Sequence, residues 1–267
     1  MTVQTFKRYR YLISMLVLFI VSNHVRAGAT PPAREYYEIK VYHLKDATQE
    51  ATIDKYLEQA FIPALHKAGI RKVGVFKPVG NDTAVDRRIY VLIPYRSMDQ
   101  FVKLPQLLAG SKEHAAAGKE YLEAGYDTPP YTRMESILLQ AFTGQPQLTL
   151  SSLTGNKRER IYELRSYEGP TEALYRNKVQ MFNKGDEVGL FKRLGFNAVF
   201  YGEVLSGSRM PNLMYMTTFE NKASREEHWK AFSSDPYWKK LSADPGYQHN
   251  VSGSTILFLY PADYSDI

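Results

Sequence analysis

A short alternating segment that occurs twice constrains the fold of this chain more than any other feature. Residues 37–42 read Tyr-Glu-Ile-Lys-Val-Tyr, and residues 162–167 read Tyr-Glu-Leu-Arg-Ser-Tyr. Side chains along a β-strand alternate between two faces, so each copy combines one largely apolar face with one face of an acid, a base and a phenol. The repetition predicts two similarly built units, each beginning with this strand.

The polar faces of the two copies hold the candidate ligand-binding residues. Two sheets in one chain can bury these faces on each other, and the space between them would then be lined by polar side chains. We expect each buried charge to need a partner, supplied by Glu38 or Lys40 of the other unit or by a neighbouring strand. The six residues are Glu38, Lys40 and Tyr42 in the first copy and Glu163, Arg165 and Tyr167 in the second.

Two interpretations of these six residues stay open. The carboxylates could act as an acid–base pair, and the tyrosines could donate hydrogen bonds to a bound carbonyl or oxyanion. Alternatively, the charged residues form ion pairs along a polar seam and the tyrosines are packed and hydrogen-bonded. A deep pocket that contains Tyr42, Tyr167 or Arg165 would favour ligand binding, whereas salt-bridged side chains that fill the space would favour a structural role.

The first 29 residues are typical of a secretory signal peptide. Basic residues within 7–10 precede an apolar run at 11–21, and Ala27-Gly28-Ala29 forms a small-residue cleavage site. The run is shorter than the roughly 20 residues that span a bilayer, and an uncleaved anchor is the alternative. We predict an exported protein, periplasmic or secreted, that begins near Thr30 and keeps no membrane anchor. N-terminal sequencing that finds the apolar run intact would contradict this.

Charge and composition limit the classes of partner. Cleavage removes four basic residues and no acidic one, which lowers the formal charge from +6 to +2. This balance and the absence of a basic stripe with interleaved aromatics give no support for nucleic-acid binding. The chain has 20 tyrosines, which suit half-wet pockets because each has an apolar ring and a polar tip. A small molecule is therefore the predicted partner, and a homo-oligomer is left open.

Each unit is predicted to have the element order β-α-β-β-α-β, a split ferredoxin-like fold. In the first unit a helix begins after Asp46, should kink at Pro63 and stops at Gly69. In the second unit Ser224 is predicted to cap a helix that Asp235-Pro236 interrupts. The predicted strands are 36–44, 72–76, 88–95 and 135–142 in the first unit, and 160–167, 197–202, 210–219 and 254–260 in the second.

The second unit most clearly resembles a NIPSNAP domain. Besides its opening strand it has Leu194-Gly195-Phe196 before the second strand, and Ala-Phe-Ser-Ser-Asp-Pro-Tyr-Trp at 231–238 between two helical pieces. The first unit keeps the opening strand and the turn at Gly69. It replaces the 231–238 segment by a longer region at 102–131. Both units are identified as NIPSNAP-like on these residues.

The resemblance implies a fold more than a chemistry. NIPSNAP domains have the dimeric α+β barrel fold, so the expected class is α+β, with two tandem ferredoxin-like units that pair as an intrachain pseudo-dimeric barrel. The expected domains are a signal peptide at 1–29, a first domain at 30–142, a linker at 143–159 and a second domain at 160–267. The family has no agreed catalytic mechanism, so no catalytic residue is assigned, and related barrels include cofactor-free monooxygenases, haem proteins and binding proteins.

Several kinds of chemistry find no support in the sequence. The chain has no cysteine, which excludes disulfides, thiol nucleophiles and thiolate metal sites. The histidines lack H-x-H or H-E-x-x-H spacing, and no glycine-rich phosphate loop follows a strand. We therefore predict no metal and no cofactor. The leading hypothesis is a protein that binds a small apolar or aromatic molecule, with cofactor-independent catalysis as an extension, and the alternative is a non-catalytic scaffold with a filled barrel.

Overall fold

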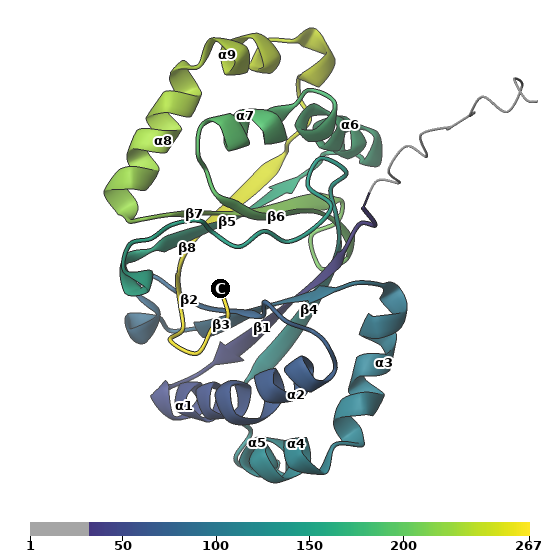
Figure 1. The fold of residues 1–267 in the computed structure, drawn as a ribbon, viewed down its shortest axis with the longest axis vertical. Coiled ribbons are helices and arrows are strands. Elements are labelled where there is room, and N and C mark those ends of the chain that lie inside the picture. Colours follow the sequence, from purple (N-terminus) through teal and green to yellow (C-terminus); the bar gives the residue numbers. More distant parts are fainter. Residues whose placement is uncertain (1–31) are drawn as a thin grey trace, which may run out of the picture. The chain divides into compact units, whose positions relative to one another are not determined.

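Eight antiparallel strands close into one barrel in the computed structural model, which describes residues 32–267 (Figure 1). The strand order around the barrel is β1-β3-β2-β8-β5-β7-β6-β4. The predicted signal peptide lies outside the described residues. The strands are β1 Tyr36–Leu44, β2 Gly74–Pro78, β3 Arg87–Tyr95, β4 Arg133–Ala141, β5 Ile161–Glu168, β6 Ala198–Ser206, β7 Asn212–Phe219 and β8 Gly253–Pro261.

The barrel consists of two four-stranded sheets that meet at both edges. Each half has its first strand at the centre, paired with its third and fourth strands, as in a ferredoxin-like unit. The halves join where β2 pairs with β8 and where β4 pairs with β6. All eight predicted strands are present, and the predicted fold class, an intrachain pair of βαββαβ units, is confirmed. Closure of the barrel leaves no open sheet edge between the halves.

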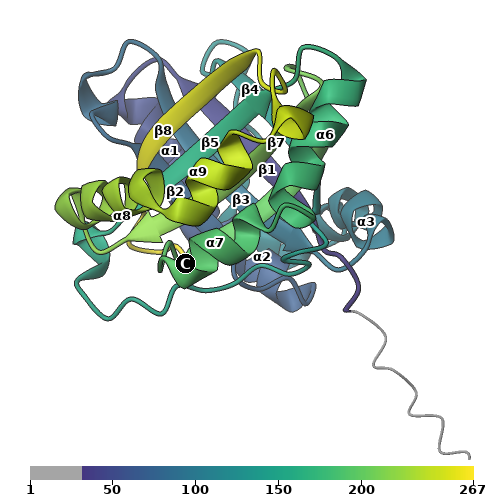
Figure 2. The ribbon, with the colours of Figure 1, turned by 90° about the horizontal axis from the view of Figure 1, so that it is seen from above.

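Helices cover the outer face of each sheet, on opposite sides of the barrel (Figures 1 and 2). None of the helices within residues 32–267 is both long and apolar enough to span a bilayer. The helices of the first half are α1 Ala47–Tyr56, η1 Leu57–Phe61, α2 Ile62–Lys67, η2 Asn81–Thr83, α3 Met98–Ala109, α4 Lys112–Ala117 and α5 Lys119–Leu122. Those that follow are η3 Lys157–Glu159, α6 Glu172–Asn183, α7 Glu187–Arg193, α8 Lys222–Ser234, α9 Pro236–Ser242 and η4 Pro245–Tyr247.

Local hydrogen bonds explain where several helices begin. Asp46 accepts from the backbone N–H of Gln49 at 2.9 Å, and the Gln49 side chain accepts from the N–H of Lys45, so the helix begins after Asp46 as predicted. Before Pro63 the helix widens into the π-helical turn η1, a local adjustment at the place where the sequence predicted a kink. Ser224 is not the cap of α8. Asn221 caps this helix and accepts from the Ser224 N–H at 2.9 Å.

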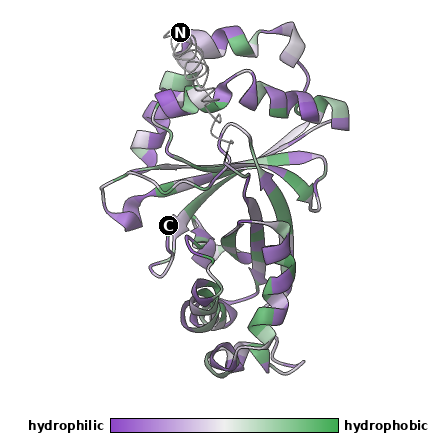
Figure 3. Ribbon diagram, turned by 45° about the vertical axis from the view of Figure 1, so that its right-hand side comes forward, coloured by the Kyte–Doolittle hydropathy of each residue, from purple (hydrophilic) through white to green (hydrophobic). Residues whose placement is uncertain are grey.

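The repeated strand faces the barrel with its apolar side, which contradicts the prediction that the polar faces meet inside. Tyr37 and Ile39 from β1 share one core cluster with Tyr162 and Leu164 from β5. The polar sides of β1 and β5 point outward to the helices instead. On the outer face of the second sheet, α8 supplies Arg225 and Trp229 as hydrogen-bond donors to Glu163, and a buried charge needs such partners. Figure 3 shows apolar residues along the strands between the two helical layers.

Candidate ligand pocket between sheet and helices

The first half contains a cavity of about 370 Å³ between the outer face of its sheet and the helices. Strands β1, β3 and β4 form its floor, and α1, η1, α3 and α5 form its walls. The three predicted residues of the first copy all line it. The complete lining is Glu38, Lys40, Tyr42, Tyr56, Phe61, Tyr95, Phe101, Val102, Leu104, Pro105, Leu108, Tyr121 and Met134.

Glu38 is a buried carboxylate that is held by neutral groups. Glu38 is 5% exposed, and its carboxylate accepts hydrogen bonds from Tyr95 Oη at 2.8 Å and from Ser136 Oγ at 2.7 Å. Burial, and then the neighbouring Glu38 charge, raise the pKa of Tyr95, so its phenol stays protonated and remains a donor. Within residues 32–267, Glu38 forms no ion pair with lysine or arginine. A carboxylate in such a place favours a further hydrogen-bond donor.

Lys40 lies two residues further along the same face of β1 and is half-buried. Its Nζ lies 5.4 Å from the centroid of the Phe61 ring, in a cation–π contact. Among the described residues no carboxylate is within ion-pair distance of this ammonium group. The cavity is thus lined by one acid and one base that do not pair with each other.

Aromatic rings form one wall of the cavity. Tyr56 and Tyr121 are stacked with ring centroids 3.8 Å apart, and Tyr42 meets Tyr121 edge-on at 6.4 Å. Burial raises the pKa of Tyr121 to about 12 and raises the pKa of Tyr42 as well, with the nearby Tyr121 and Tyr56 as lesser causes. These phenols are therefore neutral near pH 7, and they offer flat apolar surfaces with hydrogen-bonding tips.

The corresponding place in the second half is filled by an ion cluster. Glu163 has no solvent exposure. It accepts from Arg165 Nε at 2.7 Å, from Arg225 Nε at 2.8 Å and Nη2 at 3.0 Å, and from Trp229 Nε1 at 2.9 Å. The guanidinium of Arg165 also stacks 3.7 Å from the ring centroid of Trp229. Glu163 is thus partnered by Arg165, Arg225 and Trp229, all from its own half.

The electrostatics of this cluster favour the ionised state. Burial would raise the pKa of Glu163, but hydrogen bonds and charges from Arg225 and Arg165 outweigh it, so the pKa of Glu163 lies below its usual range. Arg165 Nη1 donates to Tyr167 Oη at 2.9 Å, and that hydroxyl lies 2.9 Å from the hydroxyl of Tyr215. The prediction that Glu38 or Lys40 supplies the partners is wrong, because α8 and the same strand supply them.

A second buried ion pair completes the filling of the second half. Lys178 Nζ of α6 lies 3.0 Å from Glu187 Oε2 of α7, and both side chains are less than one-tenth exposed. Complete burial raises the pKa of Glu187, and the Lys178 charge opposes this rise. Aromatic side chains, among them Phe182, Phe191 and Trp229, occupy the remaining space. No sequence pattern pointed to this pair, whose members are nine residues apart on two helices.

The six predicted residues therefore separate into two groups of three on opposite sides of the barrel. Glu38, Lys40 and Tyr42 line the cavity, whereas Glu163, Arg165 and Tyr167 belong to the ion cluster. Sequence reasoning missed the partners that the helices supply. A signal existed for two of them, since Arg225 and Trp229 are four residues apart and so lie on one helical face. Tyr95 and Ser136 carried no such signal. Within residues 32–267, no three His, Asp or Glu side chains cluster as metal ligands would.

Comparisons with solved structures identify related folds. A protein described as "Putative monooxygenase" from Fusobacterium nucleatum aligns with 86% of this chain and 93% of its own, with a TM-score of 0.54 and 8% identity. A "putative monooxygenase" from Lactobacillus acidophilus aligns with 85% of this chain and 94% of its own, with a TM-score of 0.53 and 14% identity. At these identities the likeness concerns the fold alone.

A third structure, an anthrone oxidase-like protein, aligns with 87% of this chain and 93% of its own, with a TM-score of 0.50 and 9% identity. No curated protein matches the chain. The NIPSNAP family model matches residues 162–266, which span β5 to β8 with their helices. The second half of the chain is therefore a NIPSNAP domain.

Proposed function

We propose that the first half of this protein binds a small, largely apolar molecule that carries both a hydroxyl and an acidic group. The observation that supports this is a pair of opposite charges, Glu38 and Lys40, that line one apolar cavity without pairing. A protein that needed these charges only for stability would gain from joining them, as the second half does around Glu163. Separate unpaired charges in an apolar cavity suit a ligand with two complementary polar groups.

The two charged side chains determine which polar groups the ligand needs. Glu38 would accept a hydrogen bond from a hydroxyl, and Lys40 would pair with a carboxylate or another anionic oxygen. The rings of Tyr56, Phe61 and Tyr121 would pack against the apolar body. A hydroxylated aromatic acid combines these features in one rigid molecule.

A second candidate function is catalytic. Glu38 is held by two neutral hydroxyl donors and by no cation within residues 32–267, so it could take the proton of a bound phenol while Lys40 stabilises the charge that develops on the ligand. Two of the structures with a similar fold are described as putative monooxygenases, which is compatible with such a step. We also propose that the protein is exported, with cleavage near Thr30. This proposal rests on the N-terminal sequence alone.

Titration with a fluorescent hydroxynaphthoic acid, whose two groups lie on opposite rings, tests the proposal. Glu38→Gln and Lys40→Met are each expected to weaken binding about tenfold, the effect of one charge-assisted hydrogen bond. Naphthol lacks the acid, so its binding should respond to Glu38→Gln and not to Lys40→Met. Naphthoic acid should show the reverse pattern.

Lys103→Met provides the matched control, because Lys103 is an exposed lysine of α3 that does not line the cavity. Circular dichroism and thermal melts of each variant establish that the fold is intact. If the three probes bind equally to wild type and to both cavity variants, the pair of charges does not recognise a ligand and the scaffold alternative is preferred.

A further inference from the structure

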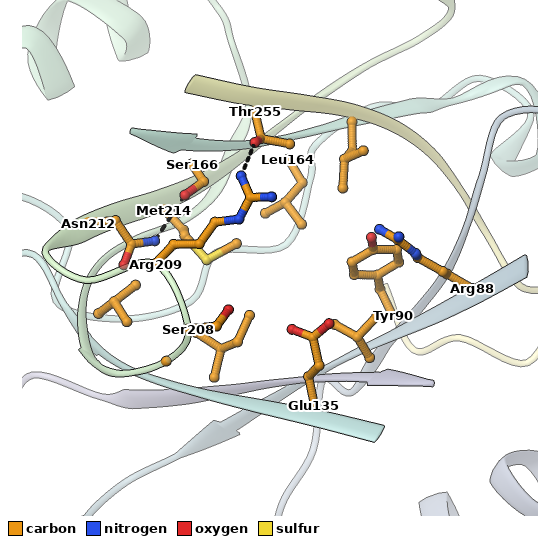
Figure 4. Close-up of a pocket in the computed structure, with 15 residues that line it drawn as sticks. Arg88, Tyr90, Glu135, Leu164, Ser166, Ser208, Arg209, Asn212, Met214 and Thr255 are labelled. Atoms are coloured by element: carbon orange, nitrogen blue, oxygen red, sulfur yellow. Dashed lines mark hydrogen bonds between the residues drawn. The ribbon is translucent and has the colours of Figure 1, made fainter. Parts of the chain in front are cut away.

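A second cavity, of about 260 Å³, lies inside one end of the barrel, between the two sheets (Figure 4). It shares strands β1, β3 and β4 with the first cavity but uses their opposite faces. On β1, Val41 lines this cavity and Tyr42 the other, and on β4 the same holds for Glu135 and Met134. Leu164, Met214 and Leu257 give it an apolar floor. None of the residues predicted from the sequence belongs to it.

Arg209 contributes a guanidinium with spare donors. It lies on the loop between β6 and β7, and its side chain is 61% exposed. Nη1 donates to Glu168 Oε1 at 3.0 Å and to Thr255 Oγ1 at 3.1 Å, and Nε and Nη2 have no acceptor within residues 32–267. Figure 4 shows the guanidinium extending across the cavity to Thr255. Such a free edge can hold a carboxylate through two parallel hydrogen bonds.

Asn212 provides a buried acceptor that nothing satisfies. The residue is 4% exposed, and its Nδ2 donates to Ser166 Oγ at 2.9 Å. Its Oδ1 is buried without a hydrogen-bond partner in the described part of the chain. Both residues line the cavity. A buried acceptor left unpaired is unfavourable, so a donor on a bound molecule would be favoured here.

The other half of the barrel contributes a carboxylate. Glu135 Oε1 lies 2.7 Å from His43 Nε2, and His43 Nδ1 lies 3.0 Å from Asp86. Asp86 in turn pairs with Arg88 at 2.6 Å. Glu135 Oε2 has no partner among residues 32–267, and Figure 4 shows the carboxylate directed into the cavity.

The charges around this cavity are of both signs and nearly balanced. Arg88 and Arg209 are opposed by Asp86, Glu135 and Glu168, and His43 lies between Asp86 and Glu135. A ligand with a single net charge would disturb this balance. We infer that the cavity binds a small amino carboxylate, whose carboxylate pairs with Arg209, whose ammonium group donates to Glu135 or to Asn212 Oδ1, and whose carbon chain rests on the apolar floor.

Calorimetric titration of the whole protein tests this inference with four compounds that share a six-carbon chain. ε-Aminocaproate carries both charges at opposite ends, and norleucine carries them on adjacent carbons. Hexanoate and hexylamine carry one charge each. We expect one of the two amino carboxylates to bind at least ten times more tightly than either single-charge compound, because each lost ion pair removes about one order of magnitude. Preference for ε-aminocaproate would show that the groups that bind the carboxylate and the ammonium lie far apart, and preference for norleucine would show that they lie close together.

Two variants locate the site. Arg209→Met should abolish the advantage of the amino carboxylate over hexylamine, and the double variant Glu135→Gln, Asn212→Ala should abolish its advantage over hexanoate, whichever of the two acceptors holds the ammonium group. Arg133→Met is the control, since Arg133 is exposed on β4 beside this end of the barrel and does not line the cavity. Hexanoate that binds as well as both amino carboxylates would overturn the inference, and so would the absence of any binding at millimolar concentration. Val102→Trp, which closes the first cavity, should leave this titration unchanged, so the two proposals can fail separately.

Discussion

Replacement of Glu163 by leucine is expected to lower the free energy of unfolding by about 3–5 kcal/mol, the usual effect of removing one partner from a buried ion pair. Glu163 is fully buried and is shared by Arg165 and Arg225, whose side chains are 11% and 19% exposed. The variant therefore leaves two guanidinium groups without their acceptor in a site that water reaches poorly. Urea unfolding of wild type and variant measures the difference.

Variants within the same cluster separate charge from packing. Arg165→Met alone should have a smaller effect, because Arg225 and Trp229 still hold the carboxylate. The triple variant Glu163→Leu, Arg165→Met, Arg225→Met removes all the charges together and should recover most of the lost stability, since apolar groups of similar volume can replace a buried ion cluster. A loss below about 1 kcal/mol for Glu163→Leu, as for an exposed pair, would contradict the buried cluster.

The pH dependence of unfolding provides an independent readout of the same carboxylate. The pKa of Glu163 is lowered in the folded state. The ionised carboxylate therefore contributes fully to the free energy of unfolding above its unfolded pKa of about 4.3, and this contribution is lost as pH falls through the pKa of the folded state. Wild type should therefore lose stability more steeply than Glu163→Gln below about pH 4. Parallel curves for the two proteins would show that the carboxylate has the same pKa folded and unfolded.

Val102→Trp is expected to weaken binding of hydroxynaphthoic acid by about 100-fold or more, equivalent to roughly 2.7 kcal/mol. Val102 lines the sheet–helix cavity from α3 and is 65% exposed, so an indole at this position can fold over the opening and occupy the space of the ligand. Because the residue is at the surface, little core packing is disturbed and the melting temperature should change little.

Leu107→Trp is the matched control for this substitution. Leu107 belongs to the same helix and is 56% exposed, but it does not line the cavity. It adds the same indole to the surface and should leave the affinity unchanged. Equal loss of binding in both variants would show that the probe binds to the outside of α3, and unchanged binding in both would place it elsewhere on the protein.

The repeated strand allowed the fold to be predicted but not the direction of its faces. Alternation within 37–42 and 162–167 shows that each strand has two kinds of face, and it does not tell which of them a helix covers. That depends on partners far along the chain, such as Arg225 and Trp229, which donate hydrogen bonds to Glu163. The alternation therefore identified the polar faces correctly, but they were predicted to face the barrel interior and instead face the helices.

The residues that line the two cavities differ in how well they can be predicted from the sequence. Glu38, Lys40 and Tyr42 lie on one strand, so their common face was visible as a local pattern, and they do share a cavity. Arg209, Asn212 and Glu135 come from a loop, a strand end and the other half of the barrel. Only the closure of the sheets brings them together, and no local periodicity records that closure.

Joining both sheets in one chain has a genetic consequence. In a homodimeric barrel every substitution appears twice, so a change that fills one sheet–helix space with charged side chains fills the other as well. Here each half is encoded separately, and a substitution around Glu163 does not alter the surroundings of Glu38. One half can accumulate changes that raise stability while the other half keeps a cavity. The two properties, which compete for the same residues in a symmetric protein, can be selected independently in this one.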